Sequence, residues 1–147
     1  MLRPGRARTL VRLLAVAVPP YFAWEMLQAP FFTGMPEDWA AATALCALAT
    51  LGDGALVAVV VLVGARLYRN GRWFVPPSPS RYGVLVLVGA ALQIIVEWVM
   101  VYGLGRWGYA ANQPILPVIR VGIAPVLQPI VLLPLVFWLT ARWEGAR

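Results

Sequence analysis

The sequence contains no histidine, no lysine, one cysteine (Cys46) and only two serines (Ser78 and Ser80). The lack of histidine excludes Ser-His and Cys-His catalytic pairs and every His-ligated metal site. A single cysteine forms no internal disulfide bond, and its apolar neighbours favour a small packing residue over a nucleophile. Both serines lie in a proline-rich segment away from the intramembrane acids, which argues against serine hydrolysis.

Charged residues are also scarce: they make up 12% of the 147 residues, whereas hydrophobic residues make up 61%. A soluble domain carries about 25% charged residues, and a disordered chain has low hydrophobicity, so the composition excludes both classes. The net charge of +6 comes from twelve arginines that cluster at the ends of apolar stretches. Arginines in such places set membrane topology, so we expect membrane lipids around the chain and no nucleic acid partner.

Four segments are long and apolar enough to cross a membrane, which takes about 20 residues. They are Leu10–Phe32, Trp39–Val63, Tyr82–Leu104 and Ile115–Thr140. Short segments rich in proline and glycine separate them and prevent the helices from continuing. The sequence therefore predicts an all-α fold, with residues 1–147 forming one integral membrane four-helix bundle.

The arginines also predict an orientation. Two of them, Arg106 and Arg120, lie in or beside the connection between the third and fourth spans. The other ten lie on the opposite predicted side, before the first span, between the second and third, and after the fourth: Arg3, Arg6, Arg8, Arg12, Arg66, Arg69, Arg72, Arg81, Arg142 and Arg147. Cytoplasmic loops carry an excess of arginine, so both termini are predicted to be cytoplasmic.

One acidic residue interrupts each of the first three spans: Glu25, Asp53 and Glu97. Each costs about 2.5–3.5 kcal/mol at a helix centre, so intramembrane acids are candidates for a functional site. At 1.5 Å per residue, Glu25 and Asp53 lie about 20 Å from the flanking arginines, Glu97 about 24 Å, and Gln128 of the fourth span about 21 Å. We therefore expect these polar groups to share a cavity in the outer half of the membrane.

Neighbouring polar and aromatic residues extend this candidate site. Gln93 shares a helix face with Glu97 at i, i+4, and the arginines near the outer end could reach the acids or hold an anionic head group. The predicted binding residues are Arg106, Arg120, Gln128, Gln93, Trp107, Tyr109, Trp24 and Thr50. The alternative is a structural polar network, in which the arginines neutralise the acids and the amides join helices.

General acid–base catalysis is the chemistry that this inventory favours. The spacing of the acids matches no metal-ligand motif, and no phosphate-binding loop follows a strand, so we expect neither metal nor cofactor. A carboxylic acid in an apolar cavity keeps its proton, whereas one held by arginine stays ionised. We expect Asp53 and Glu97 to form the acid–base pair, with Glu25 as an accessory acid and Arg106, Arg120 and Gln128 orienting an isoprenoid-, sterol- or acyl-like substrate.

Several short motifs resemble a bacterial family of uncharacterised four-helix membrane proteins: Trp24-Glu25, Ala49-Thr50-Leu51-Gly52-Asp53, Gly105-x-Trp107-x-Tyr109, Pro114-x-x-Pro117 and Gly122-x-x-Pro125-x-x-Gln128. This resemblance covers most of the chain and implies a bacterial plasma membrane location. More remotely, the span count, buried acids and proline-rich last span are similar to the sterol isomerase and sigma-2 receptor-like superfamily. That similarity implies acids that handle cationic or carbocation-like species in an apolar cavity.

Three hypotheses for function follow. The first is a membrane enzyme that transfers protons during isomerisation, cyclisation or hydration of a lipophilic substrate. The second is a small proton-coupled multidrug-type transporter that acts as a homodimer, although the strong charge bias argues against dual topology. The third is a non-catalytic binding or assembly subunit, in which the polar layer fixes only the helix register.

Overall fold

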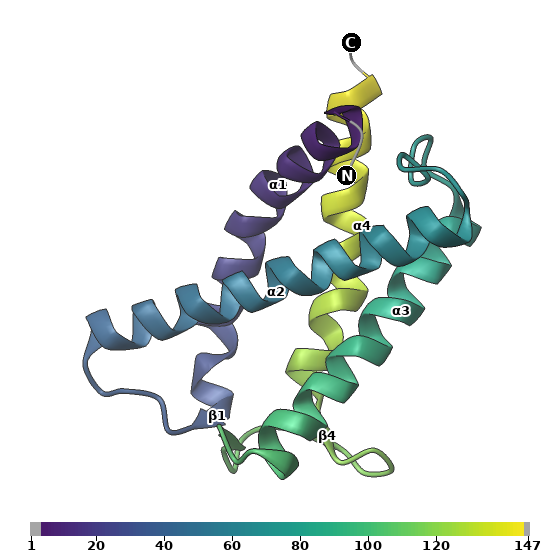
Figure 1. Cartoon of the computed structure of the whole chain (residues 1–147). Helices are drawn as coiled ribbons and strands as arrows, with labels where there is room; N and C mark the ends of the chain where they lie inside the picture. The colour runs from purple at the N-terminus through teal and green to yellow at the C-terminus, as the bar shows by residue number, and fades with distance from the viewer. Residues whose placement is uncertain (1–3, 146–147) are drawn as a thin grey trace.

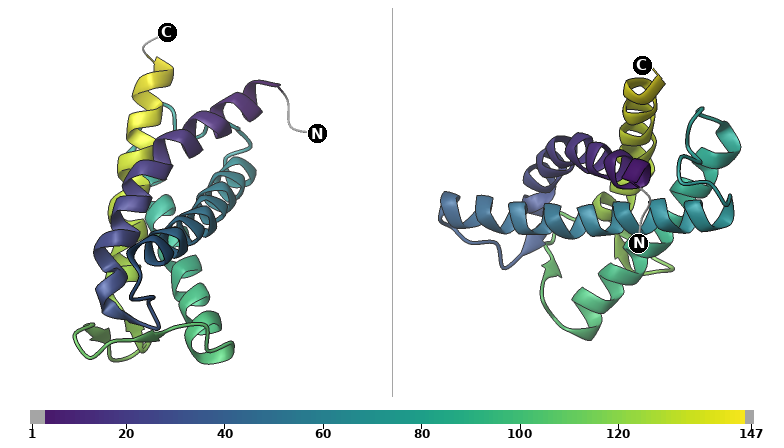
Figure 2. Two further views of the ribbon diagram at one scale, coloured as in Figure 1. Left: turned by 90° about the vertical axis from the view of Figure 1, so that its left-hand side faces the viewer. Right: turned by 45° about the horizontal axis from the view of Figure 1, so that its top comes forward.

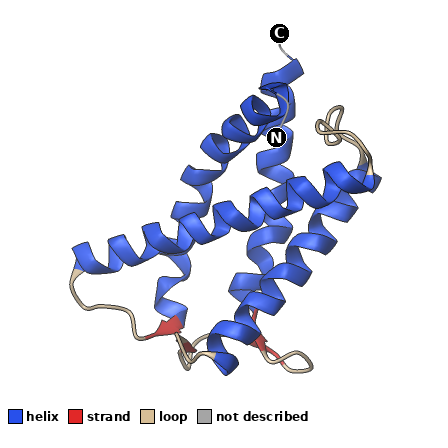
Figure 3. Cartoon of the chain, viewed as in Figure 1, coloured by secondary structure: helices blue, strands red, loops and turns tan. Residues whose placement is uncertain are grey.

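The computed structural model describes residues 4–145 and is an all-α four-helix bundle. The long helices are α1 (Pro4–Gln28), α2 (Trp39–Leu67), α3 (Pro79–Glu97) and α4 (Ile123–Gly145). Two short helical segments extend α1 and α3: η1 (Ala29–Phe31) and η2 (Trp98–Gly103). Four two-residue strands, β1 (Phe32–Thr33), β2 (Gly108–Tyr109), β3 (Ile115–Leu116) and β4 (Val121–Gly122), lie together at one end (Figures 1 and 3).

Each long helix is apolar and long enough to cross a membrane, and the chain is a multi-pass membrane protein. The spans run over Ala7–Phe31, Trp39–Leu67, Pro79–Gly103 and Ile123–Gly145. Three of them match the predicted segments closely. The fourth prediction was wrong at its start, because residues 115–122 form the β3–β4 hairpin instead of helix. Pro114 and Pro117 restrict the backbone there, and Arg120 adopts a positive φ of 56°, which no helix contains.

The helix ends follow from local chemistry. Asp38 caps α2, because its carboxylate accepts a hydrogen bond from the Ala41 N–H at 2.7 Å. Ser78 caps α3 by accepting from the Arg81 N–H at 3.4 Å. Pro19 and Pro20 lie inside α1 without ending it; each removes a backbone donor, and α1 changes direction along its length (Figure 2).

Both termini lie at the same end of the bundle as the α2–α3 connection (Figure 1). We call this the arginine-rich end, because Arg8, Arg12, Arg66, Arg69, Arg72, Arg81 and Arg142 all belong to these segments. The opposite end holds the four strands, Arg106 and Arg120. Arg3 and Arg147, which the topology prediction also used, lie outside the described residues.

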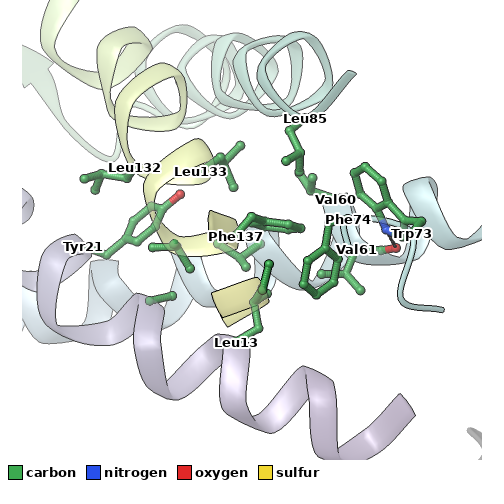
Figure 4. Close-up of a cluster of buried hydrophobic side chains, with 14 residues drawn as sticks. Leu13, Tyr21, Val60, Val61, Trp73, Phe74, Leu85, Leu132, Leu133 and Phe137 are labelled. Atoms are coloured by element: carbon green, nitrogen blue, oxygen red, sulfur yellow. Dashed lines mark hydrogen bonds between the residues drawn. The ribbon is translucent and has the colours of Figure 1, made fainter. Parts of the chain in front are cut away.

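A cluster of buried hydrophobic side chains fills the bundle toward the arginine-rich end (Figure 4). Its aromatic centre is formed by Trp73, Phe74 and Phe137, each at most 1% exposed. Phe74 and Phe137 meet edge to face with ring centroids 4.9 Å apart. The Trp73 indole N–H donates to the Val61 carbonyl at 3.1 Å, so the α2–α3 connection folds back into the bundle.

An ion-pair network closes the arginine-rich end. The Glu144 carboxylate on α4 accepts hydrogen bonds from Arg12 at 2.8 Å and from the Thr9 hydroxyl at 3.3 Å, both on α1. Its second oxygen lies 3.3 Å from Arg72 in the α2–α3 connection. Glu144 was not among the predicted site residues, and it joins three segments that are far apart in the sequence.

Candidate functional site

Glu25 and Asp53 meet at one amide group. The Gln128 Nε2 atom donates to Glu25 Oε1 at 2.8 Å and to Asp53 Oδ2 at 3.1 Å. The three residues come from α1, α2 and α4, and Gln128 is only 1% exposed. Side chains from three of the four helices therefore meet at one level of the bundle, as the equal spacing from the arginines predicted.

A second amide supports Glu25 from its own helix. Gln28, one turn further along α1, donates to Glu25 Oε1 at 2.7 Å. The Trp24 indole N–H in turn donates to Gln28 Oε1 at 3.1 Å. Trp24, predicted as a binding residue, thus reaches the carboxylate only through Gln28. Glu25 accepts hydrogen bonds from two amides, which fixes its carboxylate toward Asp53.

Glu97 is the centre of a separate cluster near the opposite end. Its Oε2 accepts from the Tyr109 hydroxyl at 2.6 Å and lies 3.5 Å from the Trp107 indole nitrogen. Its Oε1 is 3.4 Å from Gln93 Nε2, as the i, i+4 spacing predicted. Tyr109 lies outside the spans, and burial together with the Glu97 hydrogen bond raises the pKa of its hydroxyl. That hydroxyl therefore stays protonated and remains a donor to Glu97.

Short strands hold Tyr109 in position. Strand β2 pairs antiparallel with β1, so that Tyr109 lies opposite Phe32 and Gly108 opposite Thr33. The rings of Phe32 and Tyr109 are 5.8 Å apart. A Cβ atom at position 108 would lie 2.8 Å from the Thr33 hydroxyl oxygen, so the strand pair requires glycine there.

Between the two clusters lies a cavity of about 10 Å³. Its polar lining consists of Tyr21, Asp53, Gln93 and Gln128. Asp53 and Gln128 belong to the cluster around Glu25, and Gln93 belongs to the cluster around Glu97. A volume of about 10–15 Å³ admits a single water molecule. Of the three acids that the sequence placed in one shared cavity, only Asp53 lines this one. The cavity is also far smaller than an isoprenoid, because Leu133 and Pro129 of α4 pack directly against Gly89 of α3.

The two outer arginines do not contact the acids. Among the side chains of residues 7–145, the ion pairs involve only Glu144, Arg12 and Arg72. Arg120 lies over the Tyr102 ring, 5.7 Å from its centroid, and Arg106 is exposed. Arg106 and Arg120 therefore do not reach the acids in this structure, and the β3–β4 hairpin carries Arg120 away from the bundle interior.

The π-helical segment η2 explains how that hairpin is held. Trp98 donates from its indole N–H to the Ile119 carbonyl at 2.7 Å, and the Tyr102 hydroxyl donates to the Arg120 carbonyl at 2.6 Å. Both residues belong to η2, which begins directly after Glu97. π-Helical turns are rare in proteins, and those that occur are often found at functional sites. Here η2 directs two aromatic residues to the hairpin while Glu97 faces the interior.

Thr50 does not join the polar cluster. Its hydroxyl donates to the Cys46 carbonyl in its own helix at 2.8 Å, so it serves local structure. Within the described chain, no group of three or more acidic or cysteine side chains is arranged to hold a metal ion. Sequence reasoning missed Tyr21, whose position one turn before Glu25 at i, i+4 was the available signal.

The site is therefore an uncompensated group of carboxyls and amides in the apolar interior of the bundle. Two carboxyl groups that share one amide, with no cation paired to either among residues 7–145, repel each other when both are ionised. Such an arrangement can store a proton and give it up.

In comparisons with known proteins, no protein-family model, curated protein or solved structure matches this chain.

Proposed function

We propose that this chain is a small membrane enzyme that transfers protons to and from a lipophilic substrate, in a reaction such as isomerisation, cyclisation or hydration. The Glu25–Asp53 pair is its acid–base group, and Glu97 is a second acid nearer the opposite end. As the family resemblance implies, it works in the plasma membrane of a bacterium, with the arginine-rich end in the cytoplasm.

One observation carries this proposal: Glu25 and Asp53 both bind Gln128 Nε2, and no basic side chain of the described chain pairs with either. Structural carboxylates inside membranes are normally paired with a cation. A pair that lacks one binds a proton, which it can donate to a carbon or oxygen atom, and its ionised partner can remove a proton elsewhere.

The surroundings favour a lipophilic substrate over a polar one. The cavity beside Asp53 is otherwise lined by Leu56, Val57, Val60 and Leu133. Helices α2 and α3 diverge from the arginine-rich end toward the opposite end (Figures 1 and 2). A substrate dissolved in the outer leaflet would reach Asp53 by further separation of these two helices. Gly52, with no atom within 4 Å of the position of a Cβ, would let such a ligand approach the backbone beside Asp53.

Deuterium incorporation tests the proposal even while the substrate is unidentified. The purified protein is incubated in D2O with a lipid extract of the organism that encodes it, and mass spectrometry detects deuterium at non-exchangeable positions. We expect at least one lipid to gain deuterium with the wild type, and none with Asp53→Asn or Glu25→Gln. Glu37→Gln is the matched control, because it removes the same charge at a site outside the pair and should retain activity.

If the lipid extract gains no deuterium with the wild type, or if both Asp53→Asn and Glu25→Gln are fully active, the proposal of an enzyme is wrong.

The second candidate is a proton-coupled transporter acting as a dimer. The carboxyl pair without a cationic partner favours it, because intramembrane acids of this kind relay protons in pumps and transporters. A drug or lipophilic cation that releases protons from the detergent-solubilised wild type, but not from Asp53→Asn, would support transport.

A further inference from the structure

The cavity beside Asp53 has the size and the lining of a site for one water molecule. Its volume is about 10 Å³, and four polar side chains border it: Tyr21, Asp53, Gln93 and Gln128. A buried water molecule needs about two to four polar partners. The four residues come from all four helices, so a water here would touch each helix of the bundle.

The Tyr21 hydroxyl points to such an occupant. The side chain is 5% exposed, and its hydroxyl has no hydrogen-bond partner among residues 7–145. A hydroxyl that lies away from bulk water without a partner is destabilising. Because Tyr21 borders the cavity, a water molecule there would satisfy this hydroxyl together with the Asp53 carboxyl group.

Toward the arginine-rich end, the cavity meets the hydrophobic cluster. Val57, Val60 and Leu133 belong to this cluster and also line the cavity. Trp73, Phe74 and Phe137 are members of the same cluster and lie beyond them (Figure 4). Among the described residues, the next carboxyl group at that end is Glu144, which is already bound to Arg12. In this direction the described residues therefore offer a proton no carboxyl group that is free of an ion pair.

Toward the opposite end, polar groups continue. Gln93 borders the cavity and also contacts Glu97 Oε1 at 3.4 Å. Glu97 Oε2 is bound by Tyr109 at 2.6 Å, and Tyr109 is only half-buried on strand β2. The titratable groups facing the pair are Glu97 on α3, the hydroxyl of Tyr21 on α1 and the thiol of Cys46 on α2, which faces Glu25. The amide of Gln128 faces the pair from α4.

We propose that the cavity binds one water molecule, which connects the Glu25–Asp53 pair to Glu97, so that the pair exchanges its proton with the Tyr109 side of the membrane. In each exchange a proton leaves the Glu97 carboxylic acid and reaches the ionised carboxylate of the pair by way of the water. Glu97 does not itself border the cavity, so the water moves past the Gln93 side chain to collect this proton. Glu97 then regains a proton from bulk water beside Tyr109. Gln93 and Tyr21 are positioning residues that hold this water. The inference rests on the proposed proton-transfer function, and it adds the route.

Infrared spectroscopy of the full chain in detergent tests the water site. The C=O stretching band of the protonated pair is identified by its loss in Asp53→Asn, and its shift after transfer to D2O gives the exchange rate. We expect Gln93→Leu to slow exchange about 100-fold, because an apolar side chain then separates the water from Glu97. Tyr21→Phe, which keeps the shape of the ring, should slow it about 5-fold, because the water loses one hydrogen bond.

Tyr82→Phe is the matched control. The Tyr82 hydroxyl is also buried and without a partner in the described part of the chain, but it packs against the hydrophobic cluster instead of the cavity. We expect Tyr82→Phe to exchange at the wild-type rate. Wild-type exchange rates in both Gln93→Leu and Tyr21→Phe would overturn the water site while leaving the proposed function intact. The absence of a protonated band in the wild type would instead refute the proposed function.

Proteoliposomes test the direction of exchange. The protein is sorted to one orientation by capture of a tag at its C-terminus, and the pH is raised on the outside only. We expect the band to disappear promptly when the Tyr109 side faces the alkaline medium, and at least about 10-fold more slowly when the arginine-rich end does. A faster loss from the arginine-rich end would overturn the route.

Discussion

The amide of Gln128 should contribute strongly to the stability of the bundle, because it joins two helices to its own. The Gln128→Leu substitution removes this amide and puts an apolar side chain of similar size in its place. The variant loses hydrogen bonds of 2.8 Å to Glu25 and 3.1 Å to Asp53. Two hydrogen bonds at about 0.6 kcal/mol each, the average within membrane proteins, give a loss of about 1 kcal/mol. One bond to a charged carboxylate at about 2 kcal/mol and one to a protonated carboxyl group at about 1 kcal/mol give about 3 kcal/mol. We therefore expect the free energy of unfolding to fall by about 1–3 kcal/mol.

The assay is reversible unfolding in mixed micelles of mild and denaturing detergent, followed by far-ultraviolet circular dichroism. A double-mutant cycle with Asp53→Asn separates the bridge from a general packing defect. If Gln128 acts on the carboxyl pair, the two substitutions will be non-additive by more than about 0.5 kcal/mol.

Thr140→Val provides the control for this cycle. Thr140 is fully buried on the same helix, and among residues 7–145 its hydroxyl bonds only to the Val136 carbonyl of that helix. Its effect should add to that of Asp53→Asn. Equal additivity for Gln128→Leu and Thr140→Val would refute the reasoning, because the amide would then contribute nothing specific to the acids.

Two further predictions concern the arginine-rich end. Glu144→Gln should reduce the free energy of unfolding by about 2 kcal/mol, between the values for exposed and fully buried ion pairs, because Arg12 loses its partner at 2.8 Å; a change below about 0.5 kcal/mol in the same unfolding assay would contradict this. Gly64→Ala should destabilise by about 1–3 kcal/mol, because its Cβ would overlap the buried indole of Trp73. Gly52→Ala, where no atom lies within 4 Å of the new Cβ, is its control and should be neutral or stabilising.

The spans and the depth of the polar groups were predictable because both depend on spacing along single helices. A rise of 1.5 Å per residue is enough to bring Glu25, Asp53 and Gln128 to one level. Which carboxyl groups pair is a different question, since it depends on helix rotation and crossing. The sequence favoured Asp53 with Glu97, whereas the hydrogen bonds to Gln128 join Asp53 with Glu25.

The remaining errors have a common physical cause. Residues 115–122 are apolar enough for a span, but hydrophobicity reports membrane preference and not backbone conformation. Contacts with Trp98 and Tyr102 select the hairpin there, and these contacts involve residues about 20 positions away. The same fold moves Arg120 away from the acids. Tertiary hydrogen bonds of this kind leave no periodic signal in a single sequence.

The uneven distribution of the hydrophobic cluster has a consequence for motion. Aromatic rings and the Glu144 network hold the helices together at the arginine-rich end, whereas amide and carboxyl groups join them on the other side of Asp53. Regions with fewer packed apolar contacts open at lower free energy. Amide hydrogen exchange should therefore be slowest around Phe74 and Phe137 and faster beside Asp53. In such a partial opening, the helices would stay packed around the aromatic residues of the hydrophobic cluster and separate at the end that holds the strands. The carboxyl pair would then be exposed to the bilayer before the whole bundle unfolds.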